Sequence, residues 1–437
     1  MSEFQFYDGE EFITFNLIDI NTEKKEITVA VTDRGRITKS LLKTVDKCIG
    51  RFYNKHNRRL HSSGETNMVA IKEVQSRKDK RTFLNFPIRL YRGNDCFVPP
   101  LYGDERKLFR KNYHYYDTSE AVYYLAYRGK TVVGRISGIL QKASNKKWAQ
   151  KRVRFTRFDC IDDREVAAAL FGAVEDWARS KGMEEVVGPL GFSDLEREGL
   201  LIEGFDELST FEEQYNAPYY QALIEGLGYE KEVDWVEHKL YLPETVDPRI
   251  HEMREKLLVR YGLHMSAAKN ADEFIRLYKD AFFELLDTTY SDIYGTVPFT
   301  EKMKDELVRS FRLIIDIRFV TMILDKDEKP VCFGLCFPSI ARAVQKSGGK
   351  LTPAAIMRVL KAVKDPEIID LALIGVLPAY RGASIILIDE LTRMLREGNV
   401  KYCETNLNLE DNHAILNLWK NFGNVLHKRR RCYLKKL

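Results

Sequence analysis

The chain has 437 residues, with 69 Lys and Arg against 64 Asp and Glu, which gives a net charge of +5. Hydrophobic residues make up 44% and charged residues 30%. This composition is typical of folded globular domains, and it excludes a disordered tail, a collagen-like repeat and a disulfide-rich secreted scaffold. At about 150 residues per domain the length predicts two or three domains. The small charge excess does not favour nucleic-acid binding.

No apolar run reaches the ~18 residues that a membrane span requires. The acidic start, MSEFQFYDGEEF, lacks the features of a signal peptide, so we expect a cytoplasmic protein. The seven cysteines are scattered, and no Cys/His cluster has the spacing of a zinc site. We therefore expect reduced thiols, no metal site and no prosthetic group.

Residues 1–67 are predicted to form an N-terminal extension. Two strands, Phe12 to Ile20 and Glu26 to Thr32, flank a turn-forming segment and suggest a hairpin. A basic helix is predicted from Ser40 to His56, followed by a linker.

A first α/β domain is predicted over residues 68–245. Its pattern is strand, helix, two alternating strands, then strand, helix, strand, and a closing helix and strand. Asp163 is the expected N-cap of the helix from Arg164 to Lys181. A long loop from Ser193 to Ala217 precedes the closing helix YYQALIEGLGY.

The segment LPETVDPRI, with two prolines and no periodicity, marks the predicted boundary to a second domain over residues 246–437. The second section repeats the order of the first, with a hairpin, a strand (Ile369 to Val376), a helix (Ile385 to Glu397), a strand (Tyr402 to Asn406), and a closing helix and strand. We therefore expect two related α/β halves, each a mixed sheet flanked by helices.

The strongest local motif is LALIGVLPAYRGASIILIDELTRML, residues 371 to 395. A buried strand ends at Val376, and a tight turn at Arg381-Gly382 begins an amphipathic helix. Free backbone N–H groups at the positive end of a helix dipole form a phosphate-binding cradle, to which Arg381 adds a charged donor. An ordinary strand-to-helix turn is the alternative.

This motif resembles the V-x-P-x-Y-R/Q-x-x-G-x-G/A signature of the GNAT acyltransferase superfamily, which binds the coenzyme A pyrophosphate. Val376, Pro378, Tyr380 and Arg381 match, whereas Ser384 and Ile386 replace the two small residues. The resemblance implies tandem GNAT-like folds with acyl-coenzyme A, or an acyl carrier protein, as co-substrate. The implied donor-binding residues are Val376, Arg381, Gly382, Ala383, Ser384, Ile385 and Asn412.

Downstream, NHAILNLWKNFG resembles the GNAT N-x-x-A-x-x-L-Y helix, with Asn412 as either a pantetheine contact or a helix N-cap. Trp419 occupies the tyrosine position and cannot donate a proton to a thiolate. In the first half Ile224 takes that position, and Asp162 and Asp163 replace the phosphate turn. The second half is therefore the expected acyl-donor site.

Within the superfamily the chain is similar to the YghO-like bacterial group, on the stretches FVPPLYGDE, FLNFPIRLY, VGRISGI, GPLGFSDLEREGLLIEGFDE, NAPYY, LIGVLPAYRG and ETNLNLEDN. That group includes a proposed bacterial ceramide synthase. The resemblance implies transfer of a long acyl chain to a sphingoid-type amine.

Acylation of an amine needs a base for the ammonium proton and a donor for the departing thiolate. The loop GPLGFSDLEREGLLIEGFDELSTFEEQYNAPYY supplies Glu203 or Asp206 as base and Tyr215 or Tyr220 as donor. Glu404, at the end of the matching second-half strand, is an equivalent base. Solvated carboxylates and packed tyrosines are the alternative interpretation.

Two further segments each have more than one possible role. SIARAVQKSGGKLTPAAIMRVLKAVK is predicted to form amphipathic helices that pack on the sheet, cover an acyl groove or lie on the inner face of the membrane. HKRRRCYLKK is predicted either to bind phosphates or to protect the edge of a sheet.

We therefore expect an N-acyltransferase that moves an acyl group from a thioester to an amine or amino-lipid. An aminoacyl-tRNA-dependent transferase and a non-catalytic GNAT-like binding module are the alternatives.

Overall fold

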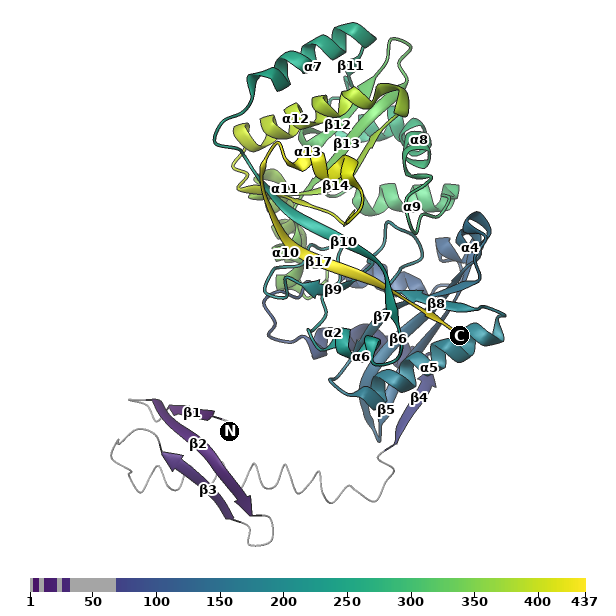
Figure 1. Ribbon diagram of the computed structural model, residues 1–437, viewed down its shortest axis with the longest axis vertical. Coiled ribbons are helices and arrows are strands. Elements are labelled where there is room, and N and C mark those ends of the chain that lie inside the picture. Colours follow the sequence, from purple (N-terminus) through teal and green to yellow (C-terminus); the bar gives the residue numbers. More distant parts are fainter. Residues whose placement is uncertain (1–2, 8–11, 22–25, 32–67) are drawn as a thin grey trace. The chain divides into compact units, whose positions relative to one another are not determined.

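The computed structural model describes residues 3–7, 12–21, 26–31 and 68–437 (Figure 1). It divides into two compact units, Met1–Met68 and Val69–Leu437. In the smaller unit, β1 (Glu3–Tyr7), β2 (Phe12–Asn21) and β3 (Glu26–Val31) form an antiparallel sheet in that order. The predicted hairpin is confirmed, and the helix expected from Ser40 to His56 lies outside the described residues.

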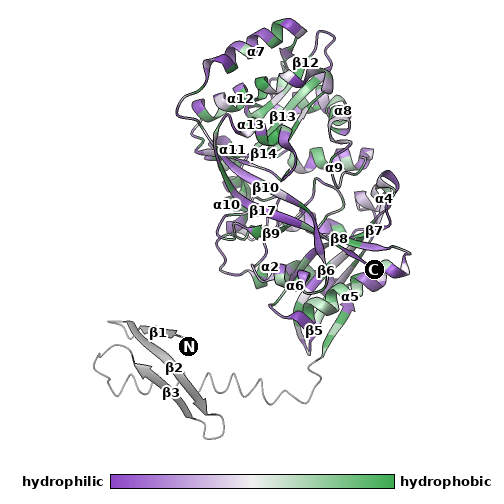
Figure 2. Cartoon of the chain, in the orientation of Figure 1, coloured by the Kyte–Doolittle hydropathy of each residue, from purple (hydrophilic) through white to green (hydrophobic). Residues whose placement is uncertain are grey.

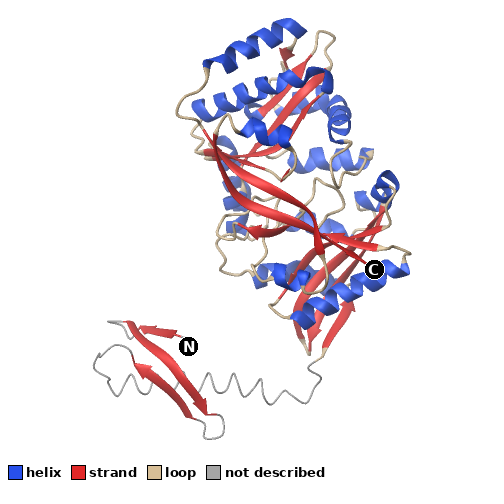
Figure 3. Cartoon of the chain, in the orientation of Figure 1, coloured by secondary structure: helices blue, strands red, loops and turns tan. Residues whose placement is uncertain are grey.

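The first half of the larger unit alternates strands with helices, as predicted (Figure 3). Its elements are β4 (Val69–Glu73), α2 (Arg77–Leu90), α3 (Tyr102–Glu105), the 3₁₀ turns η1 (Arg106–Phe109) and η2 (His114–Asp117), β5 (Ser119–Arg128), β6 (Thr131–Gln141), α4 (Lys142–Trp148), β7 (Arg152–Cys160), α5 (Arg164–Ser180), β8 (Glu185–Gly188), β9 (Leu200–Glu203), α6 (Tyr220–Glu225) and β10 (Glu230–Tyr241). Asp163 caps α5 by accepting hydrogen bonds from the amides of Glu165 and Val166.

The second half follows the same scheme with additional helices. Its elements are α7 (Pro248–Tyr261), β11 (His264–Met265), α8 (Ala271–Tyr290), α9 (Glu301–Phe311), η3 (Ile317–Phe319), β12 (Val320–Leu324), β13 (Pro330–Pro338), α10 (Ala341–Ser347), α11 (Pro353–Lys364), β14 (Ile368–Val376), η4 (Pro378–Ala383), α12 (Ser384–Glu397), β15 (Tyr402–Thr405), β16 (Asn408–Leu409), α13 (His413–Trp419) and β17 (Gly423–Lys436). The expected helical insertion is α10 and α11, separated at Gly348 and Gly349, which both have positive φ.

The two halves share one continuous sheet in the order β11-β12-β13-β14-β15-β10-β17-β8-β7-β6-β5-β4. Each half contributes its last strand to the sheet of the other, because β10 pairs with β15 of the second half and β17 pairs with β8 and β9 of the first. The mixed α/β class is confirmed. Since Val69–Leu437 forms one unit, the division at residues 245 and 246 remains our proposal.

The C-terminal strand corrects one expectation. β17 does not protect a sheet edge, because it lies between β10 and β8 in the interior of the sheet. Figure 2 shows hydrophilic residues along β10 and β17 where these two long strands run side by side. Lys428 and Arg430 of β17 are fully buried, so their charges need partners inside the protein.

Among the described residues, no helix is both long and apolar enough to cross a bilayer. Separate apolar clusters lie on the two halves, one between α5 and β6–β7 and another between α12 and β14–β15. The sheet between them positions the site described next.

Candidate active site

The two parallel strands β14 and β15 separate at the centre of the second half. Their pairing runs from Ile368 and Tyr402 to Leu371 and Thr405, where the Asn406 amide donates to the Leu371 carbonyl at 3.1 Å. Beyond this point β14 continues to Val376, whereas the other strand leads into β16, which pairs with β10. The sheet therefore opens between the two strands.

A bulge in β14 lies at this opening. The antiparallel register with β13 shifts between the Leu335–Leu373 and Cys336–Leu371 pairs, which leaves Ala372 as an extra residue on β14. A bulge changes the direction in which the following backbone groups point. As a result the amide and carbonyl of Ile374 meet a side chain, the hydroxyl of Tyr290, instead of a neighbouring strand.

A cavity of about 770 Å³ occupies the opening. Its walls are mostly apolar and come from β13, β14 and the helices α8, α9, α12 and α13. The phenylalanines of α8 and α9 that line it are Phe274, Phe282, Phe283 and Phe311. A volume of this size suits an extended organic ligand that buries most of its surface.

At one end of the cavity lies the predicted phosphate turn. Val376, Arg381 and Ser384 line it, and α12 begins at Ser384 with no side-chain cap. The 3₁₀ helix η4 runs directly into α12, and the Ser384 amide already donates to the carbonyls of Arg381 and Gly382, so the guanidinium of Arg381 is the group of this turn that favours an anion. Of the other turn residues, Gly382 is exposed and Ala383 is buried, and neither they nor Ile385 line the cavity.

Ile386 stands where the GNAT signature has a small residue, and it does not fill the turn. Its side chain is fully buried in a cluster with Ile323, Val331 and Cys332. The branched side chain therefore points into the core and leaves the cavity side of the turn to Arg381 and Ser384.

The helix α13 closes the same side of the cavity. Asn412 lines the cavity and also caps α13, because its Oδ1 accepts a hydrogen bond from the Ile415 amide at 3.3 Å. Trp419 lines the wall and donates from Nε1 to Asn408 Oδ1 at 2.8 Å. Tryptophan has no acidic proton to give to a thiolate, so an acid for the leaving group must come from elsewhere.

Tyr290 is a site residue that the sequence patterns did not single out. It lies at the end of α8, lines the cavity, and its hydroxyl donates to the Ile374 carbonyl at 3.1 Å and accepts from the Ile374 amide at 3.2 Å. Burial raises its pKa to about 12. At neutral pH this phenol is a hydrogen-bond donor that stays protonated.

Five acidic side chains also line the cavity. They are Asp194, Glu196, Glu198, Glu212 and Glu213, all from the loop between β8 and α6. Burial, together with the neighbouring carboxylate of Glu213, raises the pKa of Glu212 to about 8, although Arg197 partly opposes the shift. Burial, with the nearby Asp194, also raises the pKa of Glu198 well above its usual value.

A carboxyl group with a pKa near ambient pH is suited to accept and release a proton. The loop was singled out from its sequence, but the positions of Glu198 and Glu212 were not. Burial raises the pKa of these two carboxyls, and also those of Asp194 and Glu213, and burial is a property of the folded chain.

The four other candidates from this loop do not line the large cavity. Glu203 is exposed at the end of β9, 3.5 Å from Arg429, and Asp206 is also exposed. Tyr215 bonds Asn94 and the Phe205 carbonyl, and it lines a separate cavity of about 180 Å³.

Tyr220 is fully buried in the first half. Its hydroxyl accepts a hydrogen bond from the Cys160 amide at 2.9 Å and donates to the Cys160 carbonyl at 3.1 Å. The structure therefore brings neither tyrosine together with the phosphate turn.

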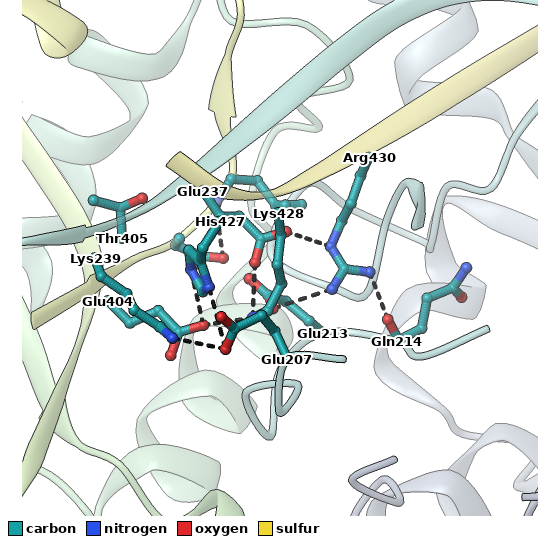
Figure 4. A network of polar contacts seen from close by, with 12 residues as sticks. Glu207, Glu213, Gln214, Glu237, Lys239, Glu404, Thr405, His427, Lys428 and Arg430 are labelled. Carbon is teal, nitrogen blue, oxygen red and sulfur yellow. Dashed lines mark hydrogen bonds and ion pairs between the residues drawn. The ribbon is translucent and has the colours of Figure 1, made fainter. Parts of the chain in front are cut away.

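Glu404 is buried in a polar network between β10, β15 and β17 (Figure 4). Its carboxylate contacts the ammonium group of Lys428 and lies 3.4 Å from His427 Nε2. Lys428 also bonds Glu213 at 3.3 Å and Glu237 at 3.1 Å, and Arg430 bonds Glu237 at 2.6 Å. Through Glu213 this network reaches the wall of the cavity.

Comparison with solved structures identifies the architecture. A tandem GNAT protein from the clavulanic acid biosynthesis pathway superposes with a TM-score of 0.50 at 13% identity, over 84% of this chain and 98% of that one. The chain has a tandem GNAT fold. In this fold the opening between β14 and β15, with the turn at Arg381, belongs to the second GNAT-like half.

Two curated proteins are similar in sequence to this tandem GNAT chain. Protein YghO of Escherichia coli K12 is 27% identical over 394 residues, which cover 85% of this chain and 97% of YghO. A bacterial ceramide synthase of Caulobacter vibrioides is 27% identical over 387 residues, which cover 84% and 98% of the two chains. No family model matches the chain.

Proposed function

We propose that the protein is an N-acyltransferase that moves an acyl group from a coenzyme A or carrier-protein thioester to an amine. The observation that supports this most is the cavity itself, whose mostly apolar wall includes both Arg381 of the predicted phosphate turn and a group of carboxylates. The acyl donor would place its phosphates at Arg381 and Ser384. The amine would enter beside the carboxylates.

The favoured pair of substrates is a long-chain acyl donor and a sphingoid-type amino-lipid. Apolar side chains of α8 and α9 surround the middle of the cavity, where an alkyl chain would be removed from water. The sequence relative named a bacterial ceramide synthase supports the same class of acceptor.

In the reaction, the amine nitrogen forms a bond to the thioester carbonyl carbon and the bond from that carbon to sulfur breaks. Glu212 accepts the proton that the ammonium group loses, in place of Glu203 and Asp206, because Glu212 lines the cavity and its pKa is raised to about 8. Tyr290 would turn its one hydroxyl proton from the Ile374 carbonyl to the leaving sulfur. A free thiol has a pKa of about 8.5, so the thiolate can take its final proton from water.

Positioning supplies much of the remaining rate enhancement. When the thioester is held along β14 and the amine at Glu212, the bimolecular reaction becomes effectively unimolecular. This lowers the activation free energy by up to about 7–11 kcal/mol.

Reversal of the charge at Arg381 tests the proposed donor site. Arg381→Glu places a negative charge against the phosphates of the donor, and the loss of one charge-assisted hydrogen bond alone costs about 1.5–3 kcal/mol. We expect acyl-coenzyme A to raise the Tm of the wild-type protein and to bind the variant at least tenfold more weakly. Thermal shift over a concentration series of acetyl-, palmitoyl- and carrier-bound donors measures this effect.

Arg249→Glu is the matched control, because Arg249 is an exposed arginine of the same half that pairs with Asp247. It should bind donors as the wild type does. If none of the donors stabilises the wild-type protein, the donor site is refuted. If donors bind but incubation with long-chain amines releases no thiol, the protein is a binding module.

We also propose that the outer face of α11 contacts the inner leaflet of the membrane. Met357 (72%) and Leu360 (48%) are exposed on α11, as is Leu351 (47%) just before the helix, and Lys350, Lys361 and Lys364 of the same segment are also exposed. The opposite face packs in the cluster of Val359, Ile315 and Phe337, and the last two also line the cavity. A bilayer at α11 would therefore lie close to the cavity that takes the lipid.

The variant Met357→Glu/Leu360→Glu tests this contact. Each lysine near an anionic surface contributes about 1 kcal/mol, and burial of the apolar side chains contributes more at about 25 cal/mol per Å². We expect the variant to bind vesicles of phosphatidylcholine and phosphatidylglycerol at least tenfold more weakly in co-sedimentation.

Met253→Glu/Val259→Glu on α7 is the control, since these side chains are also exposed. It should leave vesicle binding unchanged. Equal vesicle binding by the wild type and the α11 variant would refute the membrane contact.

A further inference from the structure

The polar network between β10, β15 and β17 has an unbalanced charge. Three buried carboxylates, those of Glu213, Glu237 and Glu404, share two fully buried cations, Lys428 and Arg430. A buried charge without a partner is strongly unfavourable. The network therefore holds one more carboxylate than cation.

The network also contains a histidine whose ring nitrogens are unused. The side chain of His427 is only 3% exposed, and within residues 68–437 neither Nδ1 nor Nε2 has a hydrogen-bond partner. Buried polar atoms without a partner are rare in native proteins. Figure 4 shows the ring directed into the carboxylates, with Nε2 3.4 Å from Glu404 Oε1.

A bulge in β17 places the histidine there. The register with β10 shifts from Glu237–Lys428 to His238–Leu426, which leaves His427 as an extra residue. In a regular strand consecutive side chains point to opposite faces of the sheet. The bulge brings His427 to the same carboxylate cluster as Lys428. The loop that follows β9 packs closely against the backbone of this bulge, because a Cβ on Gly204 (φ +86°) would lie 2.2 Å from the His427 carbonyl oxygen.

We propose that Glu237, Glu404 and His427 bind a divalent transition-metal ion. One ligand atom from each of the three lies within 4.8 Å of the other two. An imidazole nitrogen with two carboxylates is a donor set that suits Zn²⁺, and the positive charge of the ion would offset the excess of carboxylates. Lys428 lies against two of these carboxylates, so with the metal bound its ammonium group keeps Glu213 as its partner, at 3.3 Å.

The proposed metal has a structural role. Its ligands come from β10, β17 and β15, the strands through which the two halves share one sheet, and none of the three lines the large cavity. The ion would join the exchanged strands at the point where they cross. This inference stands independently of the acyl-transfer proposal.

Metal analysis of the full-length protein tests the site. We expect one zinc ion per chain by mass spectrometry after dialysis against Zn²⁺, a fall in Tm of several degrees after a chelator, and recovery on adding Zn²⁺. His427→Ala and the more conservative His427→Gln should both lose the bound ion and the chelator response.

His251→Ala is the matched control, because His251 is an exposed histidine that should retain the wild-type metal content. Replacement by Co²⁺ identifies the donors, since nitrogen and oxygen ligands give visible d–d bands without thiolate charge-transfer bands. Thiolate bands, or a wild-type protein that retains no metal and whose Tm responds to neither chelator nor Zn²⁺, would overturn the proposal. So would a His427→Gln variant that binds zinc as the wild type does.

Discussion

Glu212→Gln is expected to lower kcat for amine acylation by about 10²–10⁴-fold, the usual contribution of a general base. Glutamine keeps the shape of the side chain but cannot accept the ammonium proton. The wild-type activity should rise with pH and level off above about 8, the pKa to which burial and Glu213 raise Glu212. In the variant the rise of activity towards pH 8 should disappear. The residual activity should instead follow the ionisation of the acceptor amine at higher pH.

The stability of the same variant provides a second readout. The pKa of Glu212 is raised in the folded state, so between about pH 4.3, the usual value for glutamate, and about pH 8 the folded protein holds a proton that the unfolded chain has released. Wild-type stability therefore falls as pH rises through this window. Glu212→Gln should match the wild type in Tm at pH 4.5 and exceed it by several degrees at pH 8.5.

Glu203→Gln is the matched control, because Glu203 belongs to the same loop but is exposed. It should change neither the pH profile of kcat nor the Tm at either pH. A Glu212→Gln variant with kcat within about threefold of the wild type would refute the assignment of the base.

Arg430→Met is expected to destabilise the larger unit by about 3–5 kcal/mol, the cost of removing one partner of a buried ion pair. Arg430 is fully buried and bonds Glu237 at 2.6 Å, Glu213 at 3.2 Å and the Gln214 carbonyl. Its removal leaves Glu237 and Glu213 with less positive charge in a site that water does not reach. Urea unfolding followed by circular dichroism measures the change in the free energy of unfolding.

The second substitution Glu237→Gln should restore part of this stability, since it removes one of the uncompensated charges. Arg249→Met, at an exposed pair, should change the free energy of unfolding by less than about 1 kcal/mol. A loss below about 1 kcal/mol for Arg430→Met would contradict the proposed importance of the network.

The phosphate turn was predictable from sequence because its signals are local. The buried strand, the Val376-to-Arg381 turn and the amphipathic helix are contiguous, and each follows from hydrophobic periodicity and turn chemistry. The same holds for Asn412, whose N-cap role depends on the three residues after it. The helix α11 was also predicted as amphipathic, and contact with the sheet, an acyl groove and the membrane were the alternatives for its apolar side chains.

The acid–base residues could not be chosen from the sequence. The loop between β8 and α6 contains many carboxylates, and the sequence favoured Glu203 and Asp206, which the fold leaves exposed. Glu212 acquires its raised pKa only when segments far along the chain exclude water from it. Tyr290 likewise becomes a site residue only because β14 bulges opposite the end of α8.

The sequence by itself determined most of the order of helices and strands, the repetition of an α/β half and the position of the turn at Arg381, because these depend on residues within one element or one turn; it did not predict α4, α7 and α9. The tertiary structure alone decided that β10 and β17 are exchanged between the halves, and hence that the basic C-terminal strand is buried against Glu213, Glu237 and Glu404. Alternating charges look the same at an exposed edge and in the interior of a sheet. Long-range strand pairing decides whether the strand lies at an edge or in the interior of the sheet. It therefore also decides whether each charge is solvated or needs a buried partner.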